Sequence, residues 1–193
     1  MGQTSRKPFI VGLGGTVRPG STSERALALS LRAAEAAGAE TLLLGGAFLA
    51  GLPIYDPRPG GPSTAQEELC AAIRKADGVI VATPGYHGSL SGLMKNALDT
   101  LENTRDDPAP YFQSKPVGCI VTAEGWQAAG TTLMALRAII HAMRGWPTPF
   151  GAAMNATGGL FDEAGALRDP KDAGQLAMVA EQVMEFARMR AGG

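Results

Sequence analysis

Residues 9–25 read FIVGLGGTVRPGSTSER. A short apolar run, Phe9 to Gly14, is followed by a loop rich in glycine and hydroxyl side chains. The loop leads into an alanine- and leucine-rich helical pattern, roughly Ser23 to Ala37, that stops at Gly38. A glycine just past the last turn is typical of a helix end. The stretch therefore predicts a buried strand that turns directly into the N-terminus of a helix.

The same alternation of apolar runs and helical patterns continues along the chain. Further strands are predicted at residues 40–45, 78–84, 116–122 and 148–155. Apolar residues recur at helical spacing within residues 69–76, 90–101, 133–143 and 176–187. Because the strands are apolar on both faces, helices are expected to cover both sides of the sheet. The sequence predicts an α/β three-layer sandwich around a five-stranded parallel sheet.

Length and composition narrow the class of protein. The chain has 193 residues, a formal net charge of −1 and 45% hydrophobic residues, which indicates one domain over residues 1–193. A net charge of −1 gives no indication of a nucleic-acid partner, because such partners require an excess of positive charge. Two distant cysteines, Cys70 and Cys119, and two histidines argue against a metal site. Pro8 and the glycines that follow interrupt the first apolar run, so no signal or membrane helix is predicted and the cytoplasm is the expected location.

The first loop does not fit the two best-known phosphate-binding patterns. Against GxGxxG, it matches at Gly12 and Gly14 but has Val17 in place of the last glycine. Against GxxxxGK[ST], it has Ser21 in place of the lysine. Dinucleotide binding in the first mode and nucleoside triphosphate hydrolysis in the second are therefore disfavoured.

The loop nevertheless has the composition of an anion site. In a doubly wound sheet, ligands bind at the carboxyl ends of the strands, and a helix N-terminus there favours a phosphate. The candidate ligands of one monophosphate ester are Thr16, Arg18, Ser21, Thr22 and Ser23. In the alternative interpretation, Ser21 and Glu24 form only a capping box, and Arg18 is solvated.

The loops after the third and fourth strands are the other candidates. Pro84 and Gly85 predict an irregular turn that exposes backbone groups able to bind a flat heterocycle. Tyr86 and His87 are either ligand contacts or rim packing, and Lys95 and Asn96 can simply brace the next helix. The fourth loop offers Gly125 for close approach and Trp126 as a stacking face, whereas Glu124 has no partner nearby in sequence that would make it a general base.

Three motifs carry a resemblance to a known family. GTVRPGSTS, residues 15–23, follows G-S-x-R-x-x-S-x-[NS] with threonine for the first serine. PGYHGSLSGLMKNALD, residues 84–99, follows P-E-Y-N-x-S-x-P-G-x-L-K-N-A-[LI]-D. Residues 52–56 follow L-P-x-[YF]-D. Together they resemble the NAD(P)H-dependent FMN reductase family of flavodoxin-like proteins. The departures are Gly85 for glutamate, His87 for asparagine, and Ala128-Ala129 near a Gly-Gly pair.

The resemblance implies a flavodoxin-like strand order of 2-1-3-4-5 and a bound FMN. Thr16, Arg18, Ser21 and Ser23 would hold its phosphate, and Pro84 to Gly88 and Gly125 would meet its ring. The full expected cofactor-binding set is Thr16, Arg18, Ser21, Thr22, Ser23, Pro84, Gly85, Tyr86, His87, Gly88, Glu124 and Gly125. Relatives are commonly homodimers or homotetramers. Here the apolar face of residues 90–101 and the 103–113 loop are the expected surface; in the alternative interpretation, the loop packs on its own subunit.

The implied activity is a flavin reductase with NADPH or NADH as electron donor. Hydride would pass directly between cofactor rings, so no catalytic side chain is required. The electrons would leave to a small-molecule acceptor or to a flavin-dependent monooxygenase. The alternatives are a quinone, azo or metal reductase with tightly bound FMN, a flavodoxin-type electron carrier, and a phosphate-binding module without a redox role.

Overall fold

A computed structural model describes residues 6–58 and 60–191 of the chain. Its central sheet contains the parallel strands β1 (Phe9–Gly14), β2 (Glu40–Leu44), β3 (Gly78–Tyr86) and β5 (Pro116–Ala123). The order is β2-β1-β3-β5-β6, with β6 (Trp146–Pro147) at the far edge. From β1 the chain adds β2 on one side and then β3, β5 and β6 on the other side. This change in the order of strands confirms the predicted doubly wound arrangement.

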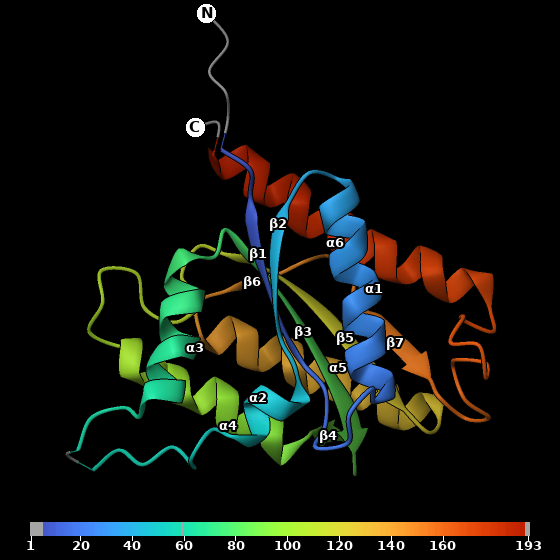
Figure 1. Cartoon of the computed structure of the whole chain (residues 1–193), viewed down its shortest axis with the longest axis horizontal. Helices are drawn as coiled ribbons and strands as arrows, with labels where there is room; N and C mark the ends of the chain where they lie inside the picture. Colours follow the sequence, from blue (N-terminus) through green and yellow to red (C-terminus); the bar gives the residue numbers. More distant parts are fainter. Residues whose placement is uncertain (1–5, 59, 192–193) are drawn as a thin grey trace, which may run out of the picture.

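Helices cover both faces of the sheet (Figure 1). On one face lie α1 (Thr22–Ala36) and α6 (Pro170–Ala191), and on the other α3 (Thr64–Lys75), α4 (Gly92–Thr100) and α5 (Trp126–Ala142). Successive strand residues point to opposite faces, so Ile80 packs in the core with α1 and α6 while Val81 packs in the core with α3, α4 and α5. This alternation of two buried faces confirms the three-layer sandwich.

The strand predicted at residues 148–155 forms only from Ala152 onward. β7 (Ala152–Asn155) pairs with the end of β5, and β6, which pairs with the start of β5, lies before the predicted run. The Thr148 N–H still donates to the Val117 carbonyl at 3.0 Å, but Pro149 has no N–H to donate and residues 149–151 leave the ladder. The Arg137 guanidinium donates to the Thr148 carbonyl at 2.6 Å. The prediction of one continuous strand over residues 148–155 was therefore wrong in its first half.

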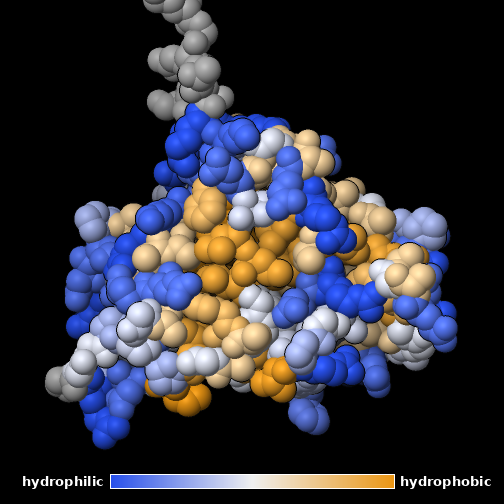
Figure 2. All heavy atoms as spheres, in the orientation of Figure 1, coloured by the Kyte–Doolittle hydropathy of each residue, from blue (hydrophilic) through white to orange (hydrophobic). Residues whose placement is uncertain are grey.

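Strand β2 is less buried than its sequence suggests. Only Leu44 is buried, whereas Leu42 is 36% and Leu43 41% exposed. β2 is an edge strand, and Figure 2 shows apolar side chains gathered on the surface over it. The expectation that both faces of every strand are covered by helices fails here, because the helices extend only partly past the edge.

Besides β6, three short elements were not predicted: α2 (Gly46–Ala50), β4 (Ser89–Leu90) and the 3-10 helix η1 (Leu101–Thr104). β4 forms an antiparallel hairpin with the end of β3. Residues 52–56 pack on α4, where the Asn96 side chain accepts from the Tyr55 N–H at 2.8 Å and donates to the Pro53 carbonyl at 3.1 Å. Lys95 pairs with Asp99 at 2.6 Å. Lys95 and Asn96 therefore brace the fold.

The surface expected to join subunits is mostly internal. Met94, Ala97 and Leu101 are fully buried in the protein's own core, and so is Phe112 of the 103–113 loop. The Tyr111 hydroxyl donates to the Glu102 carboxylate at 2.9 Å. These side chains pack within one chain, as the alternative interpretation expected, and the homo-oligomer stays a prediction.

Two other expectations concern metals and membranes. Among residues 6–58 and 60–191 there is no group of three histidine, cysteine or acidic side chains able to hold a metal ion. Within the same residues no helix has the length and apolar character needed to cross a membrane. The cytoplasmic location stays a prediction.

Both cysteines are expected to be inert in the folded protein. Burial raises the pKa of the Cys70 thiol to about 11 and that of Cys119 to about 12. Only the thiolate reacts, and at pH 8 both groups remain protonated and enclosed. Iodoacetamide at pH 8 should leave the native protein unmodified by mass spectrometry, and the same reagent in urea should label both sites. Rapid labelling without urea would contradict the burial.

Candidate cofactor site

A cavity of about 790 Å³ opens at the carboxyl ends of β1, β3 and β5. Most of the predicted site residues line it, namely Thr16, Arg18, Ser21, Thr22, Ser23, Pro84, Gly85, Tyr86, His87 and Glu124. The other two, Gly88 and Gly125, line an adjoining hollow of about 610 Å³. The structure thus brings together residues that lie more than 100 positions apart in the sequence.

Hydroxyl groups, a guanidinium and a helix N-terminus meet at one part of the cavity. α1 begins at Thr22, and the Ser21 and Ser23 side chains beside it are buried, with their hydroxyl oxygens 3.5 Å apart. The Thr16 hydroxyl accepts from the Arg18 N–H at 3.1 Å, which shapes the loop. Arg18 itself is exposed and makes no ion pair with any residue that the structure describes. Helix N–H groups, hydroxyls and a guanidinium are the donors that a phosphate requires.

The capping-box interpretation of this loop was wrong. Ser21 makes no side-chain bond to the helix backbone, and the Glu24 carboxylate accepts from the Gly46 N–H of α2 at 2.7 Å. A Cβ on Gly15 or Gly45 would lie 2.7 or 2.9 Å from that carboxylate. Glu24 therefore joins α1 to the start of α2, and the glycines make room for it.

The other end of the cavity is apolar and flat. Pro84, Ala123, Ala128 and Ala156 line it, with Tyr86 54% exposed at the rim. The turn after β3 is fixed from behind, because the Thr83 hydroxyl accepts from the Ser91 N–H at 3.1 Å. Small side chains beside a fixed backbone turn suit a planar aromatic ring.

Trp126 does not take the stacking role expected from the sequence. It is the first residue of α5, it is 67% exposed, and it lines neither the cavity nor the adjoining hollow. The helix begins there and directs its first side chain outward, so that the small Ala128 lines the cavity instead.

Sequence reasoning missed Asn155 at the end of β7. Its side-chain oxygen accepts from the Gly125 N–H at 2.9 Å and from the Thr157 N–H at 3.0 Å. Gly125 has φ +98°, a left-handed conformation that favours glycine, and this bond holds it. Val17, Thr122, Ala123, Ala128 and Ala156 also line the cavity without having been predicted. Thr122, Ala123 and Ala156 lie at or directly after strand ends, which was the available signal.

Gly85 lies against a buried hydroxyl that has no partner. A Cβ at this position would be 2.8 Å from the Thr132 hydroxyl oxygen and 2.9 Å from the Ala123 Cβ. Thr132 is fully buried, and its hydroxyl makes no hydrogen bond. The close approach of α5 to β3 explains why this turn carries glycine.

Replacing Thr132 with valine is expected to stabilise the protein. The change keeps the shape of the side chain and removes an unsatisfied buried hydroxyl, which is worth about 1 kcal/mol. Thr104→Val is the matched control, because the Thr104 hydroxyl donates to the Leu101 carbonyl and accepts from the Tyr111 N–H. Urea denaturation should show a higher midpoint for the first variant and a lower one for the second. Equal losses in both would mean that Thr132 is satisfied.

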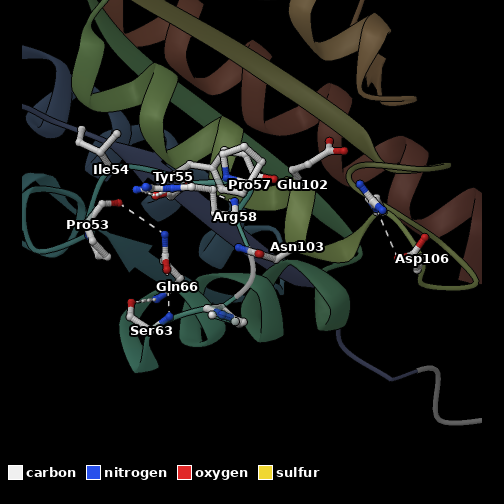
Figure 3. Close-up of a pocket in the computed structure, with 15 residues that line it drawn as sticks. Pro53, Ile54, Tyr55, Pro57, Arg58, Ser63, Gln66, Glu102, Asn103 and Asp106 are labelled. Atoms are coloured by element: carbon white, nitrogen blue, oxygen red, sulfur yellow. Dashed lines mark hydrogen bonds and ion pairs between the residues drawn. The ribbon is translucent and has the colours of Figure 1, made fainter.

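Figure 3 shows a second cavity, of about 820 Å³. It lies apart from residues 15–23, the candidate phosphate loop. Residues 53–58 form one wall, together with Gln66 of α3 and Glu102 and Asn103 of η1. Ser63 and Gln66 form a capping box at the start of α3. No residue of the phosphate loop lines this cavity, and its two arginines, Arg58 and Arg105, pair with Asp56 and Asp106.

Comparison with known proteins identifies the group to which the chain is related. The model of the NADPH-dependent FMN reductase family matches residues 8–158. The FMN-dependent NADPH-azoreductase of Staphylococcus aureus is 34% identical over 122 residues, which are 62% of this chain and 61% of that protein. The matched region therefore spans under two thirds of the relative's length.

Solved structures show the same fold at low sequence identity. FerB of Paracoccus denitrificans, a flavoenzyme NAD(P)H:(acceptor) oxidoreductase, superposes with a TM-score of 0.76 at 21% identity, covering 94% of this chain and 98% of that chain. The flavodoxin-type WrbA-like protein of Agrobacterium tumefaciens has a TM-score of 0.62 at 18% identity, covering 95% and 99%. The predicted flavodoxin-like fold is confirmed, and the chain belongs to the NADPH-dependent FMN reductase family.

Proposed function

We propose that the protein is an NAD(P)H-dependent flavin reductase whose FMN occupies the cavity at the carboxyl ends of β1, β3 and β5. The observation that carries the proposal is the two-part cavity, with phosphate donors at α1 and an apolar slot beside the β3 turn. Its volume of about 790 Å³ lies in the usual range for small-molecule sites. Family membership supports the same ligand.

The residues present fit FMN. Ser21, Ser23 and Arg18 would bind the phosphate at the N-terminus of α1, where the helix dipole favours negative charge. The backbone of Pro84 to Tyr86 would meet the ring edge, and Ala123 and Ala128 would pack on it. When bound, FMN supplies the two-electron carrier between a nicotinamide and an acceptor.

The chain's own contribution is to bind and orient the flavin and the nicotinamide nucleotide. No second phosphate loop stands beside the cavity in the described residues, so the nicotinamide nucleotide would dock shallowly over the open rim. We therefore expect little discrimination between NADPH and NADH. A homodimer or homotetramer is expected as well, and light scattering of the purified protein tests it.

A second candidate is an azo, quinone or metal reductase in which FMN stays bound during turnover. The 34% identity to the azoreductase favours it. A flavodoxin-type carrier is less well supported, because the chain is nearly neutral and holds an arginine at the phosphate loop.

Anaerobic mixing of the protein with NADPH or NADH and added FMN separates these functions. Bleaching of the flavin absorbance that saturates with added FMN would identify a reductase of diffusible flavin, which can serve a partner monooxygenase. Bleaching of only a stoichiometric bound pool would identify a reductase with resident FMN. Absence of bleaching would refute both and leave a carrier or a binding module.

A further inference from the structure

His87 lies between the cavity and the adjoining hollow and lines both. Both spaces are lined by His87, Glu124 and Ala128, and the hollow is completed by Gly88, Gly125, Gln127 and Thr131. His87 is also exposed, so its imidazole has access to solvent. Its side chain therefore borders the proposed flavin site, a second space large enough for a small molecule, and water.

The backbone holds His87 at this point. Its φ is +53°, a left-handed conformation that is uncommon outside glycine, and Gly88 follows at +79°. The hairpin on either side is paired through Gly85 with Leu90 and Tyr86 with Ser89. The imidazole is therefore carried at the tip of a tight turn whose two ends are fixed in the sheet.

We propose that His87 is the proton donor to an electron acceptor that binds in the adjoining hollow. The inference rests on the proposed function, since it concerns how the acceptor leaves reduced. An acceptor of the azo class gains two electrons and two protons: its N=N π bond breaks and two N–H bonds form. The two electrons and one proton would come as a hydride equivalent from NAD(P)H, the reductant of the proposed function, and the other proton from the His87 imidazolium. The imidazole then regains a proton from water.

The groups around His87 suit this role. Glu124, just after β5, lines the same two spaces as His87, and Arg18 of the phosphate loop lines the cavity. Tyr86 is the neighbouring group on the turn, and Thr131 of α5 faces Gly88. Histidine is the side chain that exchanges a proton most readily between pH 5 and 8.

The test compares two acceptors in the His87→Asn variant. Asparagine tolerates the left-handed backbone and cannot donate a proton as a general acid. With FMN and NADPH, transfer to an azo dye should slow by about 100-fold and lose its pH dependence, because general acids contribute at least that much. Ferricyanide takes up an electron and no proton, so the ratio of the azo-dye rate to the ferricyanide rate should fall by about the same factor. His141→Asn, in the last turn of α5, is the control and should match the parent protein with both acceptors.

A second readout needs no turnover. The chain has two histidines, so NMR resolves both imidazoles, and His141 serves as the internal reference. Addition of FMN and then of a non-reducible aromatic analogue of the acceptor should shift the His87 signals and leave those of His141 in place. Unshifted His87 signals, or equal rates with the azo dye in parent and variant, would overturn the role of His87. Failure of NADPH to reduce FMN in the parent protein would instead overturn the proposed function, and this inference with it.

Discussion

Gly46→Ala is expected to destabilise the protein by about 3 kcal/mol, because the new methyl group has no space. An ideal Cβ at this position lies 1.9 Å from the Thr16 carbonyl oxygen and 2.8 Å from the Thr16 carbonyl carbon and nitrogen. These are backbone atoms of the phosphate loop, so a side-chain rotation cannot relieve the clash. The loop must move away from α2, and the bond from the Gly46 N–H to Glu24 should weaken with it.

Two measurements follow the consequences of Gly46→Ala. Urea denaturation of the FMN-free protein reports the lost stability, and quenching of FMN fluorescence reports the distortion of the phosphate site. Gly92→Ala is the matched control, since Gly92 is likewise the first residue of a helix and a Cβ there meets nothing within 4 Å. The control should be neutral or slightly stabilised. Equal midpoints for the two variants would contradict the clash.

The parts of the fold that were predicted correctly depend on local pattern. Each apolar run of residues 9–14, 78–84 and 116–122 is a strand, because runs apolar on both faces fit only the centre of a covered sheet. The fifth strand could not be placed from its run, because Pro149 has no N–H to donate and the Thr148 carbonyl is held by Arg137 from α5. The exposure of Leu42 and Leu43 depends on β2 lying at an edge, a property of the assembled sheet.

The candidate site likewise has parts that the sequence could predict and parts that it could not. The candidate phosphate donors could be grouped from the sequence because they lie within eight residues of one another and in front of one helix. The role of Glu24 was not, because its partner Gly46 is 22 residues away and belongs to a helix that the sequence did not predict. Asn155 reaches Gly125 over 30 residues. Such contacts exist only once parallel strands bring their carboxyl ends to one edge.

Arg18→Ala is expected to weaken FMN binding by about 2 kcal/mol, or roughly 30-fold, the usual cost of one charge-assisted hydrogen bond to a phosphate. Arg18 lines the cavity and is exposed, so truncation removes little packing and should change the free energy of unfolding by under about 0.5 kcal/mol. A large loss of FMN affinity with little change in the free energy of unfolding distinguishes a ligand contact from a structural residue. Fluorescence quenching gives the FMN dissociation constant, and urea denaturation of the FMN-free protein gives the stability.

Two further variants define what Arg18 contributes. Arg32→Ala removes an exposed arginine of α1 that does not line the cavity, and it should leave FMN affinity unchanged. Arg18→Lys keeps the charge and loses the planar fork, so it should recover part of the affinity. Because the attraction is partly electrostatic, the gap between parent and Arg18→Ala should narrow as salt is raised. An FMN dissociation constant that is the same in parent and Arg18→Ala would remove Arg18 from the phosphate site and leave the α1 N-terminus and the serines to hold the anion alone.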